Sequence, residues 1–214
     1  MTIDSTNVAI LYNAASGNAR PLAEALVSKL GCRNPLQSTE DGEIVFAVPA
    51  PDVLITVGGD GTLLRAARLA AESDIPLLGA TLGRLGFLTE IEASDALEQV
   101  PLYLSGRDTW MDERRMILSR VRTDSGDSPL IHVLNDIVVG RGRAAHLTRV
   151  GVTINGVELT TYQADAVIVS TATGSTAYAL SAGGPLLYPA SSDMVIVPVA
   201  AHRDLDAPVV LSLI

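Results

Sequence analysis

The chain of 214 residues is long enough for one large domain or two small ones and for a substantial hydrophobic core. Apolar residues make up 48% of it and charged residues 18%, which excludes an intrinsically disordered chain. Only two Phe, five Tyr and one Trp are present, so the core must be built mainly from aliphatic side chains, as buried parallel sheets often are.

The charge balance and the cysteine content narrow the class of protein further. The 24 acidic side chains outnumber the 15 basic ones, which argues against a surface that binds nucleic acid or an anionic membrane. The single Cys32 excludes an internal disulfide, and no cysteine cluster suggests zinc. No basic residue precedes Arg20, as a signal peptide would require, and no apolar stretch approaches the roughly 20 residues that span a bilayer. We therefore expect a cytoplasmic protein.

The first half of the chain alternates between strand and helix patterns. Short apolar runs predict strands over residues 7–12, 51–57 and 75–79. A helix is predicted from Pro21 to a cap at Gly31, a second after the glycine-rich residues 58–62, and a third with Ser94 as its N-cap. Strands that alternate with helices indicate βαβ units, so residues 1–108 are predicted to form an α/β domain with a parallel, Rossmann-like sheet.

The second half changes to short runs rich in Val, Ile and Thr. These runs predict strands over residues 116–123, 132–139, 148–154, 158–161, 164–170, 193–199 and 208–214. Asn155-Gly156 lies between two of them and is a strong hairpin signal. Residues 109–214 are therefore predicted to form an antiparallel, β-sandwich-like domain.

The sequence Gly58-Gly59-Asp60-Gly61-Thr62 lies between a predicted strand and a predicted helix. Its glycines allow a tight turn and bring backbone N–H groups close to a ligand, and a helix N-terminus at the same place favours phosphate. An aspartate there could hold Mg²⁺ or accept a proton from an attacking hydroxyl. On these residues alone, a tight turn with Asp60 as a helix cap remains an equal alternative.

Two further segments carry polar residues beside buried strands. Asn135-Asp136 is a polar pair within an apolar run and suits a vicinal diol such as ribose, or a strand end that faces water. Residues 165–185 pass from a strand into a stretch dense in small hydroxyls and then to Tyr178, whose ring has a polar tip. Close approach to a flat ligand is one interpretation, and a plain linker is the alternative.

Taken together, these motifs resemble the NAD kinase family. GGDGT at 58–62, LGFL at 85–88, LND at 134–136, GRAAH at 142–146 and the whole stretch 165–185 occur in the family's order and spacing. GGDGT is shared with lipid kinases that act on diacylglycerol and sphingosine, whereas the stretch 165–185 is specific. The resemblance implies transfer of the γ-phosphoryl group of ATP, or of a phosphoryl group of polyphosphate, to the 2′-hydroxyl of the adenosine ribose of NAD, giving NADP, with a divalent metal, Mg²⁺.

The resemblance also assigns residues to roles. Asp60 is implied as the catalytic base, and Gly58, Gly59, Gly61 and Thr62 as phosphate-binding residues. Asn135 and Asp136 are implied to grip the ribose diol, with Phe87 near the adenosine pocket and Asp165 on the nicotinamide side. The remaining NAD-binding positions, which include Asp60 and Gly61, are His146, Gln163, Thr173, Thr176, Ala177, Tyr178 and Ser181.

Family members continue with a longer C-terminal portion, so the β-rich domain is expected to be incomplete and to present an apolar edge. Such an edge invites pairing with a second subunit, which predicts a homodimer, or the homotetramer that the family also suggests. Two alternatives to an NAD kinase are a non-catalytic homologue that binds NAD or another nucleotide, and a lipid kinase relative. Neither nucleic acid nor a membrane is an expected partner.

Overall fold

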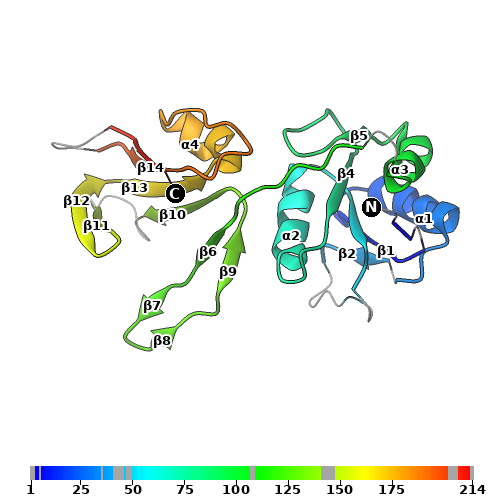
Figure 1. The fold of residues 1–214 in the computed structure, drawn as a ribbon, viewed down its shortest axis with the longest axis horizontal. Coiled ribbons are helices and arrows are strands. Elements are labelled where there is room, and N and C mark those ends of the chain that lie inside the picture. The colour runs from blue at the N-terminus through cyan, green and yellow to red at the C-terminus, as the bar shows by residue number, and fades with distance from the viewer. Residues whose placement is uncertain are drawn as a thin grey trace. The chain divides into compact units, whose positions relative to one another are not determined.

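The computed structural model describes residues 3–4, 6–34, 36–40, 46, 50–106, 109–140, 148–201 and 207–212. The chain divides into two compact units, Met1–Met111 and Asp112–Ile214 (Figure 1). Each unit has its own sheet and its own hydrophobic core.

The first unit is built on a five-stranded parallel sheet in the order β2-β1-β3-β4-β5. Its strands are β1 (Val8–Tyr12), β2 (Gln37–Ser38), β3 (Val53–Val57), β4 (Leu77–Thr81) and β5 (Ile91–Glu92). Its helices are α1 (Ala19–Leu30), α2 (Asp60–Ala70) and α3 (Ala96–Leu104). The predicted α/β fold with a parallel sheet is confirmed.

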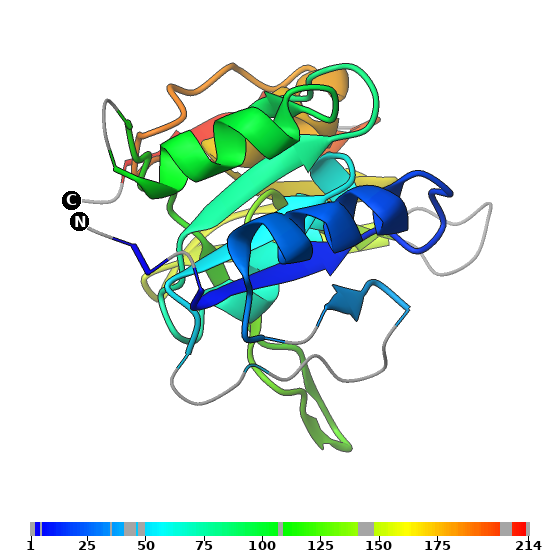
Figure 2. The ribbon, with the colours of Figure 1, turned by 90° about the vertical axis from the view of Figure 1, so that its right-hand side faces the viewer.

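Helices cover both faces of this sheet. Figure 2 shows α1 and α3 on the face nearest the viewer, where Leu26 and Val100 pack against Ile55 of β3 within one buried cluster. On the opposite face, Ala66 and Ala70 of α2 belong to a second cluster with residues of β1 and β3. Every residue of β3 is buried, and its sequence does not alternate between polar and apolar residues, since Thr56 is its only polar residue.

Several element boundaries in the first unit depart from the prediction: β3 begins at Val53, α1 at Ala19 and α2 at Asp60. The third strand runs from Leu77 to Thr81, so it begins two residues later than predicted. The prediction of Ser94 as the N-cap of the third helix was wrong. The backbone carbonyl of Asp95 accepts hydrogen bonds from the N–H groups of Glu98 and Gln99, which makes Asp95 the N-cap of α3. Gly31 ends α1 as predicted, in a left-handed conformation with φ 67°.

The second unit contains an antiparallel sheet of β10 (Asp136–Gly140), β13 (Ala166–Thr171), β14 (Met194–Val199) and β15 (Val209–Leu211). A hairpin of β11 (Thr148–Ile154) and β12 (Val157–Ala164) contributes Tyr162 and Ala164 to a buried cluster on one face of this sheet. The four-residue helices η1 (Thr173–Thr176) and α4 (Tyr178–Ser181) follow β13, and Ala179 of α4 packs with Ile168 and Val195. The antiparallel prediction is confirmed, and the two packed layers give it a sandwich-like character.

A long two-stranded arm precedes this sheet (Figure 1). It pairs β6 (Ile117–Ser119) with β9 (Ile131–Val133) and, further out, β7 (Arg122–Thr123) with β8 (Gly126–Asp127). The single strand predicted over residues 132–139 is broken between β9 and β10. The carbonyls of Leu134 and Asn135 there accept hydrogen bonds from Thr171, which replaces continuous strand pairing at this bend. No helix within the described segments has both the length and the apolar character needed to cross a membrane.

The turn between β11 and β12 provides a test of the fold. Asn155 and Gly156 have φ angles of 51° and 82°, which any residue with a Cβ adopts only at a cost. Gly156→Ala should lower the free energy of unfolding by about 1–2 kcal/mol in urea titrations. Gly151→Ala on β11 of the same hairpin is the control, since a Cβ there would meet only the Thr161 hydroxyl, at 3.7 Å. Equal effects of the two substitutions would contradict a turn with this geometry.

Candidate functional site

The glycine-rich turn joins β3 directly to α2 and leaves the first turn of that helix accessible. A Cβ at Gly58 would lie 2.2 Å from the Oγ1 atom of Thr62, so this position requires glycine. Gly59 is the N-cap of α2, and both Gly59 and Gly61 are exposed. The first backbone N–H groups of a helix have no intrahelical partner and attract anions. The turn therefore has the form of a phosphate-binding loop.

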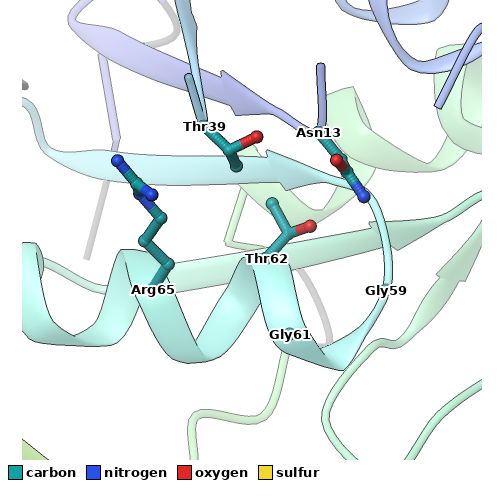
Figure 3. A pocket seen from close by; sticks show the side chains of 6 residues that line it. All are labelled: Asn13, Thr39, Gly59, Gly61, Thr62 and Arg65. Atoms are coloured by element: carbon teal, nitrogen blue, oxygen red, sulfur yellow. The ribbon is translucent and has the colours of Figure 1, made fainter. Parts of the chain in front are cut away.

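A pocket of about 280 Å³ lies beside this turn, lined by Asn13, Thr39, Gly59, Gly61, Thr62 and Arg65 (Figure 3). Asn13 follows β1, Thr39 follows β2, and the others follow β3 or belong to α2. The pocket thus lies at the carboxyl ends of adjacent parallel strands. With the strand order 2-1-3-4-5, the connections reverse direction between β1 and β3, and ligands bind at such a switch point.

Backbone hydrogen bonds fix the loops around the pocket. The N–H group of Asn13 donates to the carbonyl of Val57 at 2.9 Å, and the N–H group of Ala14 donates to the Oγ1 atom of Thr39 at 3.2 Å. Arg65 is exposed on α2, and its cationic side chain extends beside Thr39 in Figure 3. Sequence reasoning missed Asn13, Thr39 and Arg65, although the position of Arg65 one turn after Gly61 on the predicted helix was a usable signal.

The side chain of Asp60 does not cap the helix that it begins. Gly59 is the N-cap, and the two carboxylate oxygens of Asp60 accept backbone hydrogen bonds from another loop. The N–H group of Phe87 donates to Oδ2 at 2.9 Å, and that of Leu88 donates to Oδ1 at 3.2 Å. The capping alternative for Asp60 is therefore excluded.

The LGFL motif supplies this loop, which connects β4 to β5. A Cβ at Gly86 would lie between 2.2 and 2.5 Å from the carboxylate atoms of Asp60, so only glycine allows this approach. The side chain of Phe87 is 78% exposed, while its main chain is bonded to Asp60. The backbone of Phe87 therefore contacts the carboxylate, while its aromatic ring is exposed.

In the second unit, Thr171 holds the bend that carries Asn135 and Asp136. Its Oγ1 atom donates to the carbonyl of Leu134, its N–H group donates to the carbonyl of Asn135 at 2.9 Å, and Oγ1 accepts from the N–H group of Gly174. A Cβ at Gly174 would lie 2.2 Å from the carbonyl oxygen of Asn135. The bend and the turn after β13 are thus packed backbone against backbone.

Two buried polar atoms around this bend have no hydrogen-bond partner within the described part of the chain. They are the Oδ1 atom of Asn135 and the Oγ1 atom of Thr173. Asp136 begins β10 opposite Ser170, and burial raises the pKa of its carboxyl group above the ordinary value. Unpartnered buried polar atoms are rare because they are costly. Together with a partly desolvated carboxyl, they indicate a place where a polar ligand binds.

The other hydroxyls of the stretch 170–176 serve the backbone. Ser170 donates to the carbonyl of Asn135, Ser175 to that of Ala172, and Thr176 to that of Thr173. These hydroxyl groups therefore stabilise a tight turn. Thr173 differs from them, because its Oγ1 atom has no partner within the described residues. This arrangement excludes a plain linker, the alternative left open by the sequence.

The remaining predicted site residues of this unit lie at two places. Tyr178, which is 46% exposed, and Ser181 are the first and last residues of α4, and Thr176 and Ala177 directly precede it. Asp165 directly precedes β13, at the opposite end from Ser170 and about 16 Å away from it at 3.3 Å per residue. Gln163 belongs to β12, where it pairs with Arg149 of β11. His146 lies outside the described residues.

The pKa of Asp136 leads to a test that needs no ligand. Because its pKa is higher in the folded state, the unfolded chain loses this proton first as the pH rises from 3. Asp136 should therefore destabilise the fold increasingly above pH 3.8, its unperturbed value, until the folded-state pKa is passed. Asp136→Asn should match the wild type at pH 3 and be more stable than it at pH 7, measured by urea titration. If Asp136→Asn were less stable than the wild type at pH 7 while matching it at pH 3, this prediction would be contradicted.

Comparison with known proteins agrees with this geometry. Residues 9–107 match the ATP-NAD kinase N-terminal domain, and residues 134–213 match the ATP-NAD kinase C-terminal domain. The NAD kinase of Dehalococcoides mccartyi strain CBDB1 is 39% identical over 200 residues, which cover 91% of this chain and 70% of that protein. The NAD kinase of Geobacter sp. strain M21 is 41% identical over 203 residues, covering 95% of this chain and 69% of that protein.

Two solved structures share the fold. Yeast NADH kinase complexed with NADH superposes with a TM-score of 0.75 at 25% identity and covers 96% of this chain and 69% of its own. An NAD kinase from Archaeoglobus fulgidus in complex with ATP gives a TM-score of 0.72 at 26% identity, covering 96% of this chain and 77% of its own. Both domain families and both sets of relatives lead to the same conclusion: this chain belongs to the NAD kinase family.

Proposed function

We propose that this chain transfers the γ-phosphoryl group of ATP to the 2′-hydroxyl of the adenosine ribose of NAD, giving NADP. The observation that carries the proposal is the carboxylate of Asp60, which two backbone N–H groups hold at the start of α2, in the turn that lines the pocket. The family membership supports NAD kinase activity over the two alternatives, a lipid kinase relative and a non-catalytic nucleotide-binding homologue.

Asp60 is proposed to accept the proton of the attacking hydroxyl. A ribose hydroxyl is a poor nucleophile, and a carboxylate is too weak a base to deprotonate it beforehand. The proton is therefore transferred late, as the new oxygen–phosphorus bond forms and the bond to the β-phosphate oxygen breaks. Asp60 therefore needs a correct position more than a strong basicity. The two hydrogen bonds from the loop hold it in position.

The pocket beside the turn is proposed to hold the phosphates of the donor. Gly59, Gly61 and Thr62 line the pocket at the N-terminus of α2, which favours negative charge, and Gly58 allows the turn. Arg65 adds a positive charge at the same pocket. The archaeal NAD kinase relative was solved with ATP, which supports a nucleoside triphosphate as donor; polyphosphate remains a second donor to be tested alongside it.

The donor set suits a magnesium ion. No cluster of three or more His, Cys, Asp or Glu side chains occurs in the described segments, so a site made of protein ligands alone is not indicated there. Mg²⁺ is usually held by one or two carboxylates together with substrate phosphates. Each oxygen of Asp60 accepts one N–H group and retains another lone pair, so this carboxylate could contribute such a ligand. When bound there, the ion would neutralise charge on the transferring phosphoryl group.

The bend of the second unit is proposed to bind the acceptor NAD. Asn135 and Asp136 would grip the ribose diol, and the unpaired Oγ1 atom of Thr173 supplies a further polar contact. Phe87 and Tyr178 are proposed to contact the adenosine, and Asp165 the nicotinamide side. Further proposed contacts are Gly61, His146, Gln163, Thr176, Ala177 and Ser181. The yeast relative was solved with NADH, which supports a dinucleotide in this family's site.

We also propose a cytoplasmic location and assembly into a homodimer or homotetramer. Cys32 is a free thiol, which suits a reducing compartment. In the antiparallel sheet, β10 and β15 are the edge strands among the described residues, and Val138 and Val139 of β10 are each nearly half exposed. Edge strands and exposed apolar side chains favour contact with a second subunit.

The role of Asp60 has a direct test. Asp60→Asn keeps the shape of the side chain but cannot accept the proton, so the rate of NADP formation should fall by about a hundredfold or more. NAD affinity by calorimetry should stay within about threefold, because Asp60 acts on the proton in the transition state and most of the proposed NAD contacts come from other residues. A variant that retains most of the wild-type rate would contradict both the proton-acceptor role and the metal role of Asp60.

The donor pocket has a separate test. Arg65→Gln removes the positive charge that lines the pocket and should raise the KM for ATP about tenfold or more, with the KM for NAD nearly unchanged. Arg68→Gln is the matched control, since Arg68 is an exposed arginine of the same helix that does not line the pocket. If the two variants had the same KM for ATP, the pocket would not be the donor site. Repeating the assay with polyphosphate in place of ATP identifies the donor.

A further inference from the structure

We propose that Thr89 is a positioning residue for the phosphoryl transfer, acting through the backbone of residues 86–88 on the carboxylate of Asp60. This role rests on the proposed function, in which Asp60 takes part in the reaction. It adds a residue outside the glycine-rich turn that orients the reacting group without touching either substrate.

Three consecutive backbone N–H groups connect Thr89 to Asp60. That of Gly86 donates to the Oγ1 atom of Thr89 at 3.0 Å, and those of Phe87 and Leu88 donate to the two carboxylate oxygens of Asp60 at 2.9 and 3.2 Å. The bond from Gly86 to Thr89 closes the loop into a tight turn. Because the turn is closed, the next two N–H groups are directed at the same carboxylate. The Thr89 hydroxyl thus sets the direction of the bonds that hold Asp60.

Thr89 is itself fixed to the sheet. Its side chain is 5% exposed, and a Cβ at Gly79 of β4 would come within 3.1 Å of its Cα and Cγ2 atoms. The N–H group of the next residue, Glu90, donates to the carbonyl of Gly79 at 3.1 Å. The loop between β4 and β5 is therefore fixed to β4 at Thr89. Because the loop is fixed there, its N–H groups hold Asp60 in a constant position relative to the sheet.

In the same loop, the main chain and the side chain of Phe87 have different roles. The N–H group of Phe87 bonds to Asp60, whereas its ring is 78% exposed and is the proposed adenosine contact. A change that disturbs the main chain should reduce the rate of the chemical step. A change that removes only the ring should weaken NAD binding. Phe87→Ala, which keeps the N–H group, is therefore expected to raise the KM for NAD with little change in kcat.

Thr89→Val is the first test, because it keeps the branched shape and removes the acceptor of the Gly86 N–H group. We expect kcat for NADP formation to fall at least about tenfold, while the KM for NAD changes less than about threefold. Thr89→Ser restores the hydroxyl and should recover most of kcat. Thr56→Val is the matched control: Thr56 is a fully buried threonine of β3 whose Oγ1 atom has no partner within the described residues. Its kcat should stay within about twofold of the wild type.

Two kinetic results would overturn the proposal. One is a folded Thr89→Val variant with wild-type kcat. The other is an equal loss of kcat in Thr89→Val and Thr89→Ser, which would mean that packing by the methyl group, rather than the hydroxyl, is what matters.

A second variant keeps the proposal testable if Thr89→Val does not fold. Gly86→Ala leaves Thr89 in place and puts a methyl group where the carboxylate of Asp60 lies, so it should show the same loss of kcat. Wild-type kcat in this variant would overturn the proposal.

Native-state amide hydrogen exchange provides a readout that does not depend on activity. In the wild type the amides of Phe87 and Leu88 should be protected, and Asp60→Ala should remove that protection. Unprotected amides in the wild type would overturn the positioning role. A wild type that shows this protection but makes no NADP from NAD and ATP would instead contradict the proposed function.

Discussion

Two backbone N–H groups, those of Phe87 and Leu88, hold the carboxylate of Asp60, and the organisation of the first unit depends on this contact. An aspartate that begins a helix would ordinarily be drawn to the helix's own free N–H groups. Here the loop between β4 and β5 directs it elsewhere, which leaves the start of α2 accessible to a ligand. Gly86 must lack a side chain for the loop to come this close. The turn proposed to bind phosphate and the carboxylate proposed to accept the proton are thereby kept apart, although they are adjacent in sequence.

The second unit uses a similar arrangement with a different residue. The hydroxyl of Thr171, at the end of β13, bonds to the carbonyl before Asn135 and to the turn that begins η1. In both units a buried threonine near a strand end, Thr89 or Thr171, fixes an irregular loop beside residues of the proposed site. A hydroxyl suits this use because it donates and accepts at once and satisfies backbone groups that leave regular structure. The carboxyl of Asp136, with its raised pKa, shows the cost of such a site to stability.

Much of the fold could be predicted from the sequence, because buried parallel strands and glycine-rich turns have local signatures. β1 is a continuous apolar run, β3 is apolar except for Thr56, and Asn155-Gly156 specifies its hairpin. The two-residue strands β2 and β5 could not be predicted, since so short a segment carries no periodicity. The roles of Asn13 and Thr89 depend on contacts between segments distant in sequence, which no local pattern encodes.

In the proposed reaction, the carboxylate of Asp60 accepts the proton of the ribose hydroxyl while NAD is converted to NADP. The most direct measurement is ³¹P NMR of the product formed when the purified chain is incubated with NAD, ATP and Mg²⁺. A new phosphomonoester resonance from the 2′ position of the adenosine ribose should appear together with the resonances of ADP. Inorganic phosphate as the only new product, or a phosphate ester on any other hydroxyl, would contradict it.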